Sequence, residues 1–65
     1  MKTQTVINKI GGGRVRETAR QLKVPISTFY RWVESGKVPH WREVHVRAVA
    51  QRLGVNVDVE ENQPA

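Results

Sequence analysis

Glycine and proline residues divide the first 54 residues into four short segments, and this division limits the possible folds more than any other feature. The breaks are the glycine triplet at 11–13, Pro25, the loop "GKVPH" at 36–40, and Gly54. Consecutive glycines lose much backbone entropy on ordering, and proline is disfavoured inside a helix. The breaks therefore predict turns or helix ends, with only short elements between them.

Apolar residues recur at helical spacing in every segment, which predicts amphipathic helices. The expected bounds are about Thr3 to Ile10, Arg14 to Lys23, Pro25 or Ile26 to Ser35, and His40 to Leu53, with Pro39 opening the last helix at its first position. The predicted core residues of the first three helices are Val6, Ile7, Ile10, Val15, Thr18, Ala19, Leu22, Pro25, Phe29, Trp32 and Val33, with Ile26 at the margin. We predict a mainly α domain of four to five helices at 1–54, followed by a tail at 55–65.

The fourth predicted helix carries two apolar arcs, one more than a small domain usually buries. One arc comprises Trp41, Val44 and Ala48, and the other comprises Val46, Val49, Ala50 and Leu53. One arc can cover the core while the other meets a second subunit, or the tail of the same chain can cover the helix. We predict Trp41 to be a core residue and the arc of Val46, Val49, Ala50 and Leu53 to be a dimer contact.

The tail alternates Val55, Val57 and Val59 with polar residues, which is a strand pattern. A single strand cannot stand alone, so it would pair with its twin across a dimer axis or lie against the body of the domain. The alternative is an acidic tail without fixed structure, which we expect from Glu61 onward. Val55 and Val57 join the predicted dimer contacts.

The basic residues are concentrated in the body of the chain. The sequence has 65 residues, 11 Lys and Arg, 6 Asp and Glu, and a net charge of +5. All basic residues precede Gly54, with only Glu17, Glu34 and Glu43 to offset them, so this part carries +8 and the tail −3. A basic small domain is typical of a nucleic-acid binder, although many small proteins are basic for solubility alone.

Several classes of protein are poorly supported by the sequence. Cysteine is absent, and His40 and His45 have only Glu34 and Glu43 near them in sequence, which is not a convincing metal set. The glycine triplet lacks the Gly-Lys-Ser/Thr of a phosphate-binding loop, and no catalytic triad can be assembled. We therefore expect no enzyme, metal, cofactor or small-molecule ligand. With no signal-peptide pattern or membrane-length apolar run, we expect a cytoplasmic protein.

The adjacent residues Tyr30 and Arg31 fall on the face of the third helix opposite Phe29 and Trp32. Ser27 and Glu34 share this polar face, and Thr28 lies on its flank. A helix that holds hydrogen-bonding side chains away from its own core is presented to another molecule. The competing interpretation is an exposed arginine paired with Glu34 three residues on.

Two short helices joined by a three- to four-residue turn form a helix-turn-helix, whose second helix can enter the DNA major groove. The segments "RVRETARQL" and "PISTFYRWVE" fit this arrangement. The spacing of Ala19, Leu22, Val24, Phe29 and Trp32 resembles that in Cro and repressor proteins of temperate phages. The segment "VPISTFYRWVESGKVP" also looks like small Cro-like and excisionase-type regulators. The resemblance covers about Val15 to Pro39 and extends loosely to Leu53.

The chain departs from that family pattern at two positions. Lys23 stands where the turn usually has a glycine with positive φ, and Val15 stands where many members have a glutamine that contacts a phosphate. A lysine with positive φ costs on the order of 1 kcal/mol. Arg14 or Arg16 would have to replace the glutamine.

The resemblance implies a set of base-reading positions: Pro25, Ile26, Ser27, Tyr30 and Arg31. Arginine can donate two hydrogen bonds to guanine, worth about 1–3 kcal/mol of discrimination, and Ile26 or the Tyr30 ring can contact a thymine methyl. The candidate phosphate contacts are Arg14, Arg16, Arg20, Lys23, Thr28, Lys37 and His40. Glu34 would repel phosphate unless it accepts from a cytosine or lies beyond the DNA.

These expectations combine into a Cro-type repressor that binds a pseudo-palindromic operator in double-stranded DNA as a homodimer. One alternative is an excisionase-type architectural factor that bends DNA. The other, from a different class, is a protein-interaction module whose basic face meets an acidic partner.

Overall fold

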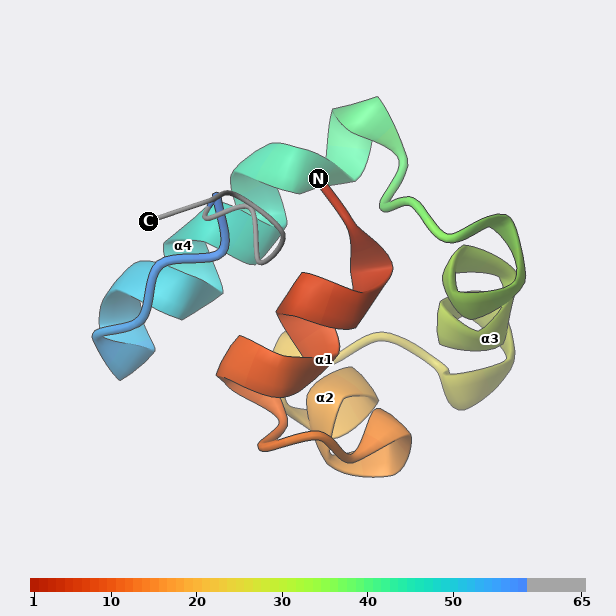
Figure 1. Ribbon diagram of the computed structural model, residues 1–65, viewed down its shortest axis with the longest axis horizontal. Coiled ribbons are helices and arrows are strands. Elements are labelled where there is room, and N and C mark those ends of the chain that lie inside the picture. The colour runs from red at the N-terminus through yellow and green to blue at the C-terminus, as the bar shows by residue number, and fades with distance from the viewer. Residues whose placement is uncertain (59–65) are drawn as a thin grey trace, which may run out of the picture.

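The computed structural model describes residues 1–58, and most of them are helical. The elements are α1 (Thr3–Ile10), α2 (Val15–Leu22), α3 (Ile26–Ser35), a short 3-10 turn η1 (His40–Arg42) and α4 (Glu43–Leu53). α1 lies in the middle of the molecule and contacts α2, α3 and α4, whereas α3 and α4 lie at opposite sides without contacting each other (Figure 1). The chain is thus a small, mainly helical domain, as predicted.

The predicted helix ends are confirmed to within about one residue, except at the start of the fourth helix. Pro39 precedes η1 and does not open an α-helix, because a 3-10 turn separates it from α4. Gly36 ends α3 in the left-handed region with φ 78°, a conformation that glycine adopts without steric penalty. Gly11 ends α1 and is buried, and a Cβ at this position would collide with the Thr18 hydroxyl of α2.

The core lies between α1 and the other three helices. Val6, Leu22, Phe29 and Val46 are each 0 % exposed, so every α-helix contributes one fully buried apolar side chain. The Phe29 and Trp32 rings pack edge to face with centroids 5.6 Å apart, a geometry that aromatic quadrupoles favour. The other buried apolar residues are Ile7, Ile10, Ala19, Val24, Trp32, Val38, Val49, Ala50 and Val57.

The amino-terminal segment anchors the carboxyl end of α3. The Thr3 N–H donates to the Gly36 carbonyl at 3.1 Å, and the buried Thr3 hydroxyl donates to the Trp32 carbonyl at 2.8 Å. Val38 N–H donates to the Met1 carbonyl at 3.1 Å. The Thr3 N–H gives the Gly36 carbonyl a partner just past the helix end, and the Thr3 hydroxyl adds a further donor to the Trp32 carbonyl, so the start of α1 is bonded to the end of α3.

Three predicted core residues, Pro25, Val33 and Trp41, are exposed. Trp41 in η1 is 73 % exposed, and its ring packs against the Arg42 guanidinium, 4.4 Å from the ring centroid. Val33 is 36 % exposed at the margin of α3, where it lines a shallow hollow with Ile7 and Lys2. The placement of these three residues in the core was wrong.

The described part of the tail folds back along α4. Val55 N–H donates to the Ala50 carbonyl, Val57 is buried, and the Asp58 carboxylate accepts hydrogen bonds from Arg47 at 3.1–3.2 Å. Residues 55–58 form no strand, which leaves the alternative that the tail lies against the body. Val59 and the predicted unstructured end from Glu61 lie outside the described residues.

Candidate nucleic-acid interface

The link between α2 and α3 consists of three residues, and its first residue has an unusual backbone conformation. Lys23 has φ 56° and ψ 40°, the only positive φ at a non-glycine residue within 1–58. Its N–H donates to the Arg20 carbonyl, and Val24 N–H donates to the Ala19 carbonyl. The positive φ expected at Lys23 is confirmed. The left-handed residue ends α2 and turns the chain, so that α3 can begin after only two more residues.

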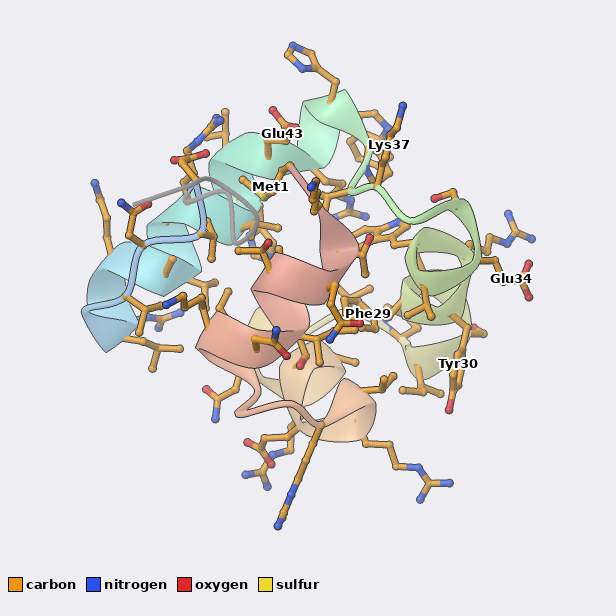
Figure 2. All side chains as sticks on the ribbon, viewed as in Figure 1. Met1, Phe29, Tyr30, Glu34, Lys37 and Glu43 are labelled. Atoms are coloured by element: carbon orange, nitrogen blue, oxygen red, sulfur yellow. The ribbon has the colours of Figure 1, made fainter. Side chains whose placement is uncertain are left out.

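Phe29 and Trp32 fix the rotation of α3 about its axis. Both rings are buried, and a helix advances about 100° per residue, so the residues on the opposite side must face outward. Tyr30 is 47 % exposed, and Ser27, Arg31 and Glu34 are exposed. Figure 2 shows Phe29 directed into the body, Tyr30 directed toward the side on which α2 lies, and Glu34 directed away.

Arg31 is available to a partner. No carboxylate among residues 1–58 lies within salt-bridge distance of its guanidinium, so the alternative pairing with Glu34 is absent from the described structure. A guanidinium without a counter-charge on a fixed helix can make a planar, two-pronged contact to a base edge or a phosphate. Pro25 and Ile26, the other predicted base-reading positions, are exposed at the amino end of α3, and Thr28 is half-buried.

A hollow of about 430 Å³ lies where α2 meets the outer face of α3. Ile26 and Tyr30, one helical turn apart, form one wall, and Arg16 and Arg20 of α2 stand on the other side. Ala19 and Val24 are buried beneath it. An apolar floor beside two guanidinium groups suits a base methyl or sugar next to a phosphate.

The cationic side chains on α2 and beside its ends differ in whether a carboxylate pairs with them. Arg20 forms an ion pair with Glu17 at 3.1 Å, although its side chain is 78 % exposed. Hydrogen bonds from Gln21 and then Arg20 lower the pKa of Glu17, so this carboxylate stays ionised beside Arg20. Arg14, Arg16 and Lys23 are exposed and form no ion pair within the described chain.

Lys37 and His40 lie beyond the carboxyl end of α3. Lys37 is exposed, and its backbone pairs with Lys2 in an isolated bridge. His40 is 99 % exposed, with Nδ1 3.5 Å from a Glu43 oxygen. α3 has ten residues and is about 15 Å long, and Lys23 and Lys37 lie just beyond its two ends.

The predicted dimer contacts on α4 need correction. Val46, Val49 and Ala50 are at most 4 % exposed and belong to the core of their own chain, as does Val57. Leu53 is 44 % exposed, and Val55 is half-buried against the core. The opposite arc, Trp41, Val44 and Ala48, faces outward. The burial of the two arcs is the reverse of what was expected, because periodicity locates both arcs without showing which one α1 and α2 cover.

Sequence reasoning missed one cation near the turn. Arg52, in the last turn of α4, lies beside Lys23 and Arg20 in a hollow between α2 and α4. No local pattern marks it, because only the packing of α4 on the end of α2 brings it there. In the described chain, no three histidine or acidic side chains gather as a metal site would require, and no helix is long and apolar enough to cross a bilayer.

Comparisons of the chain with protein-family models, curated proteins and solved structures found no match.

Proposed function

We propose that this protein binds double-stranded DNA sequence-specifically and regulates transcription in the manner of a Cro-type repressor. The observation that carries the proposal is the exposed polar face of α3, held outward by the buried Phe29–Trp32 pair and joined to α2 through the left-handed Lys23. α2, the turn and α3 would act as a helix-turn-helix, with α3 in the major groove.

Four exposed residues of α3 contact the bases in this proposal: Ile26, Ser27, Tyr30 and Arg31. Arg31 reads guanine O6 and N7, and Ser27 bonds a base edge or phosphate near the amino end of the helix. Ile26 and Tyr30 contact a thymine methyl, and Pro25 lies against the groove wall. Glu34 points away from the body in Figure 2, and in this proposal it lies beyond the DNA.

The surrounding cations supply affinity and register. Arg14, Arg16 and Arg20 follow one backbone strand along α2, while Lys23 and Lys37 lie at the two ends of α3. Thr28 and His40 complete the candidate set. Each neutralised phosphate releases counterions, so binding should weaken steeply as salt rises.

The dimer belongs to the same proposal. Two copies on a pseudo-palindromic operator would place their α3 helices about 34 Å apart, one turn of DNA. The apolar side chains exposed for such contact are Trp41 of η1 and Val44, Ala48 and Leu53 of α4, because the other apolar side chains of α4 are internal.

Selection of bound sites from random duplexes tests function and symmetry together. We expect an enriched sequence with two inverted half-sites and a complex containing two chains, measured by analytical ultracentrifugation. An enriched site without symmetry, bound by one chain with a large bend in a circular-permutation assay, would favour the excisionase-type role. Failure to retain any duplex at low salt would reject DNA binding and leave the protein-interaction module.

A further inference from the structure

A second basic hollow lies between the carboxyl ends of α2 and α4, away from the outer face of α3. Its volume is about 480 Å³, and its walls contain no carboxylate. The lining residues are Arg20, Gln21, Lys23, Val49, Arg52 and Leu53. We call this hollow the α2/α4 basic cleft. Its three cations come from two helices and the turn between α2 and α3.

Two of the three cations in this cleft are unpaired within the described chain, whereas Arg20 pairs with Glu17 at 3.1 Å. Arg52 and Lys23 are exposed and form no ion pair within residues 1–58. Arg47, also on α4, is held by Asp58 at 3.1 Å and approaches Glu43 at 3.7 Å. An uncompensated cation pair attracts an anion more strongly than an arginine that is already ion-paired.

The walls of the cleft are held in place by the fold. His45 on α4 bonds the Leu22 carbonyl through Nε2 at 2.7 Å, which ties α4 to the last residue of α2. Lys23 follows directly, with its backbone fixed in the left-handed conformation by the bond from its N–H to Arg20. The cations on the two walls therefore keep their backbone positions relative to each other, which reduces the entropy lost on binding.

The cleft is continuous with the proposed reading surface. Arg20 lines both this cleft and the hollow beside Ile26 and Tyr30. α2 thus carries a basic surface from α3 to the end of α4, two helices that do not contact each other in the described chain. A DNA backbone that passes α3 would meet Lys23 and Arg52 next along this surface.

We propose that the α2/α4 basic cleft binds a phosphate of the DNA backbone adjacent to the site read by α3, with Arg52 and Lys23 as the donors. The inference rests on the proposed function. It adds Arg52 and α4 to the interface, so the protected DNA should extend past the bases that α3 reads.

The test compares Arg52→Gln with Arg47→Gln on one selected duplex. Arg52→Gln should weaken binding about tenfold at low salt and reduce the slope of log affinity against log salt by about 0.9, the loss of one phosphate contact. Base preference should not change, and Arg52→Lys should restore most of the affinity and the slope. Arg47→Gln, in which the lost charge was already paired, should change affinity less than twofold.

Ethylation interference locates the contact. Ethylation of one phosphate outside the selected bases should block binding of the unmodified protein. The same ethylation should have no effect on binding of Arg52→Gln. Arg52→Gln and the unmodified protein could bind the selected site with the same affinity and the same salt dependence. That result would overturn the cleft proposal but leave the proposed function standing. If the unmodified protein binds no duplex at all, the proposed function itself is rejected. In an NMR titration, the Arg52 Nε–H signal could shift on addition of inorganic phosphate but not on addition of duplex DNA. That result would also overturn the cleft proposal.

Discussion

Lys23 occupies a backbone position that normally favours glycine, and its side chain lies in the basic surface. Its φ of 56° costs on the order of 1 kcal/mol for a residue with a Cβ. The positive charge supplies a reason to keep lysine there, because a glycine would relieve the backbone and remove the cation. Stability and binding therefore oppose each other at this residue.

Lys23→Gly should raise the free energy of unfolding by up to about 1 kcal/mol and weaken DNA binding. Urea unfolding and a salt titration of binding measure the two effects. Lys37→Gly is the matched control: Lys37 lacks a positive φ, so the substitution should lower stability slightly while also removing a proposed phosphate contact. A loss of stability for Lys23→Gly would contradict the strain argument.

Arg31 and Lys37 should respond differently to alanine. Arg31→Ala should relax the preference at one base position, with a loss of about 1–3 kcal/mol on the preferred sequence. Lys37→Ala should weaken all sequences about equally and reduce the salt slope by about 1. Binding to a panel of single-base variants separates these outcomes. An unchanged sequence preference for Arg31→Ala would refute its assignment as a reader.

At the scale of the elements, α1 determines how α3 is presented. α1 lies between the other helices, and Thr3 bonds the last turn of α3 through both its N–H and its hydroxyl (Figure 1). The polar face of α3 therefore depends on contacts made on the opposite side of the same helix. Rigid support of this kind positions a recognition surface better than a free helix would.

Thr3→Val should lower the free energy of unfolding by about 1 kcal/mol. The loss is moderate because the Trp32 carbonyl still accepts from Gly36 N–H at 2.9 Å and from the Ser35 hydroxyl at 3.2 Å. Thr3→Ser retains the hydroxyl and serves as the control in thermal unfolding and in hydrogen exchange of residues 32–36. Equal protection of these amides in the two variants would show that the hydroxyl does not stabilise the helix end.

At the scale of the whole molecule, a few ion pairs join segments distant in sequence. The Met1 ammonium lies 3.1 Å from Glu43, and Arg47 joins Asp58 to α4. The hydrogen bond from the ammonium lowers the pKa of Glu43, and the hydrogen bonds from Arg47 lower the pKa of Asp58. These pairs connect the amino-terminal segment and the tail to the same helix.

These lowered pKa values predict acid destabilisation. A carboxylate with a lowered pKa in the folded state stabilises fully above its ordinary pKa, 4.5 for Glu43 and 3.8 for Asp58, and loses this contribution as the pH falls through the folded value. The melting temperature should hold from pH 7 to about 5 and fall toward pH 3. Glu43→Gln should lower it at pH 7 and make the acid decline shallower. Glu34→Gln, at an exposed carboxylate, is the control and should leave the dependence of melting temperature on pH unchanged. A melting temperature that stays constant down to pH 3 for the unmodified protein would contradict the role of these pairs.

The sequence determined the short-range features of this protein, because these depend on the backbone preferences of neighbouring residues. The triplet at 11–13, Pro25 and Gly36 located the helix ends, and the spacing of Phe29 and Trp32 predicted that Tyr30 and Arg31 face outward. Only the tertiary structure decided which arc of α4 is buried, that Trp41 is exposed, and that Arg52 lies beside Lys23. A helix with two apolar arcs can bury either one, and the choice depends on long-range packing against α1 and α2 that no local pattern specifies.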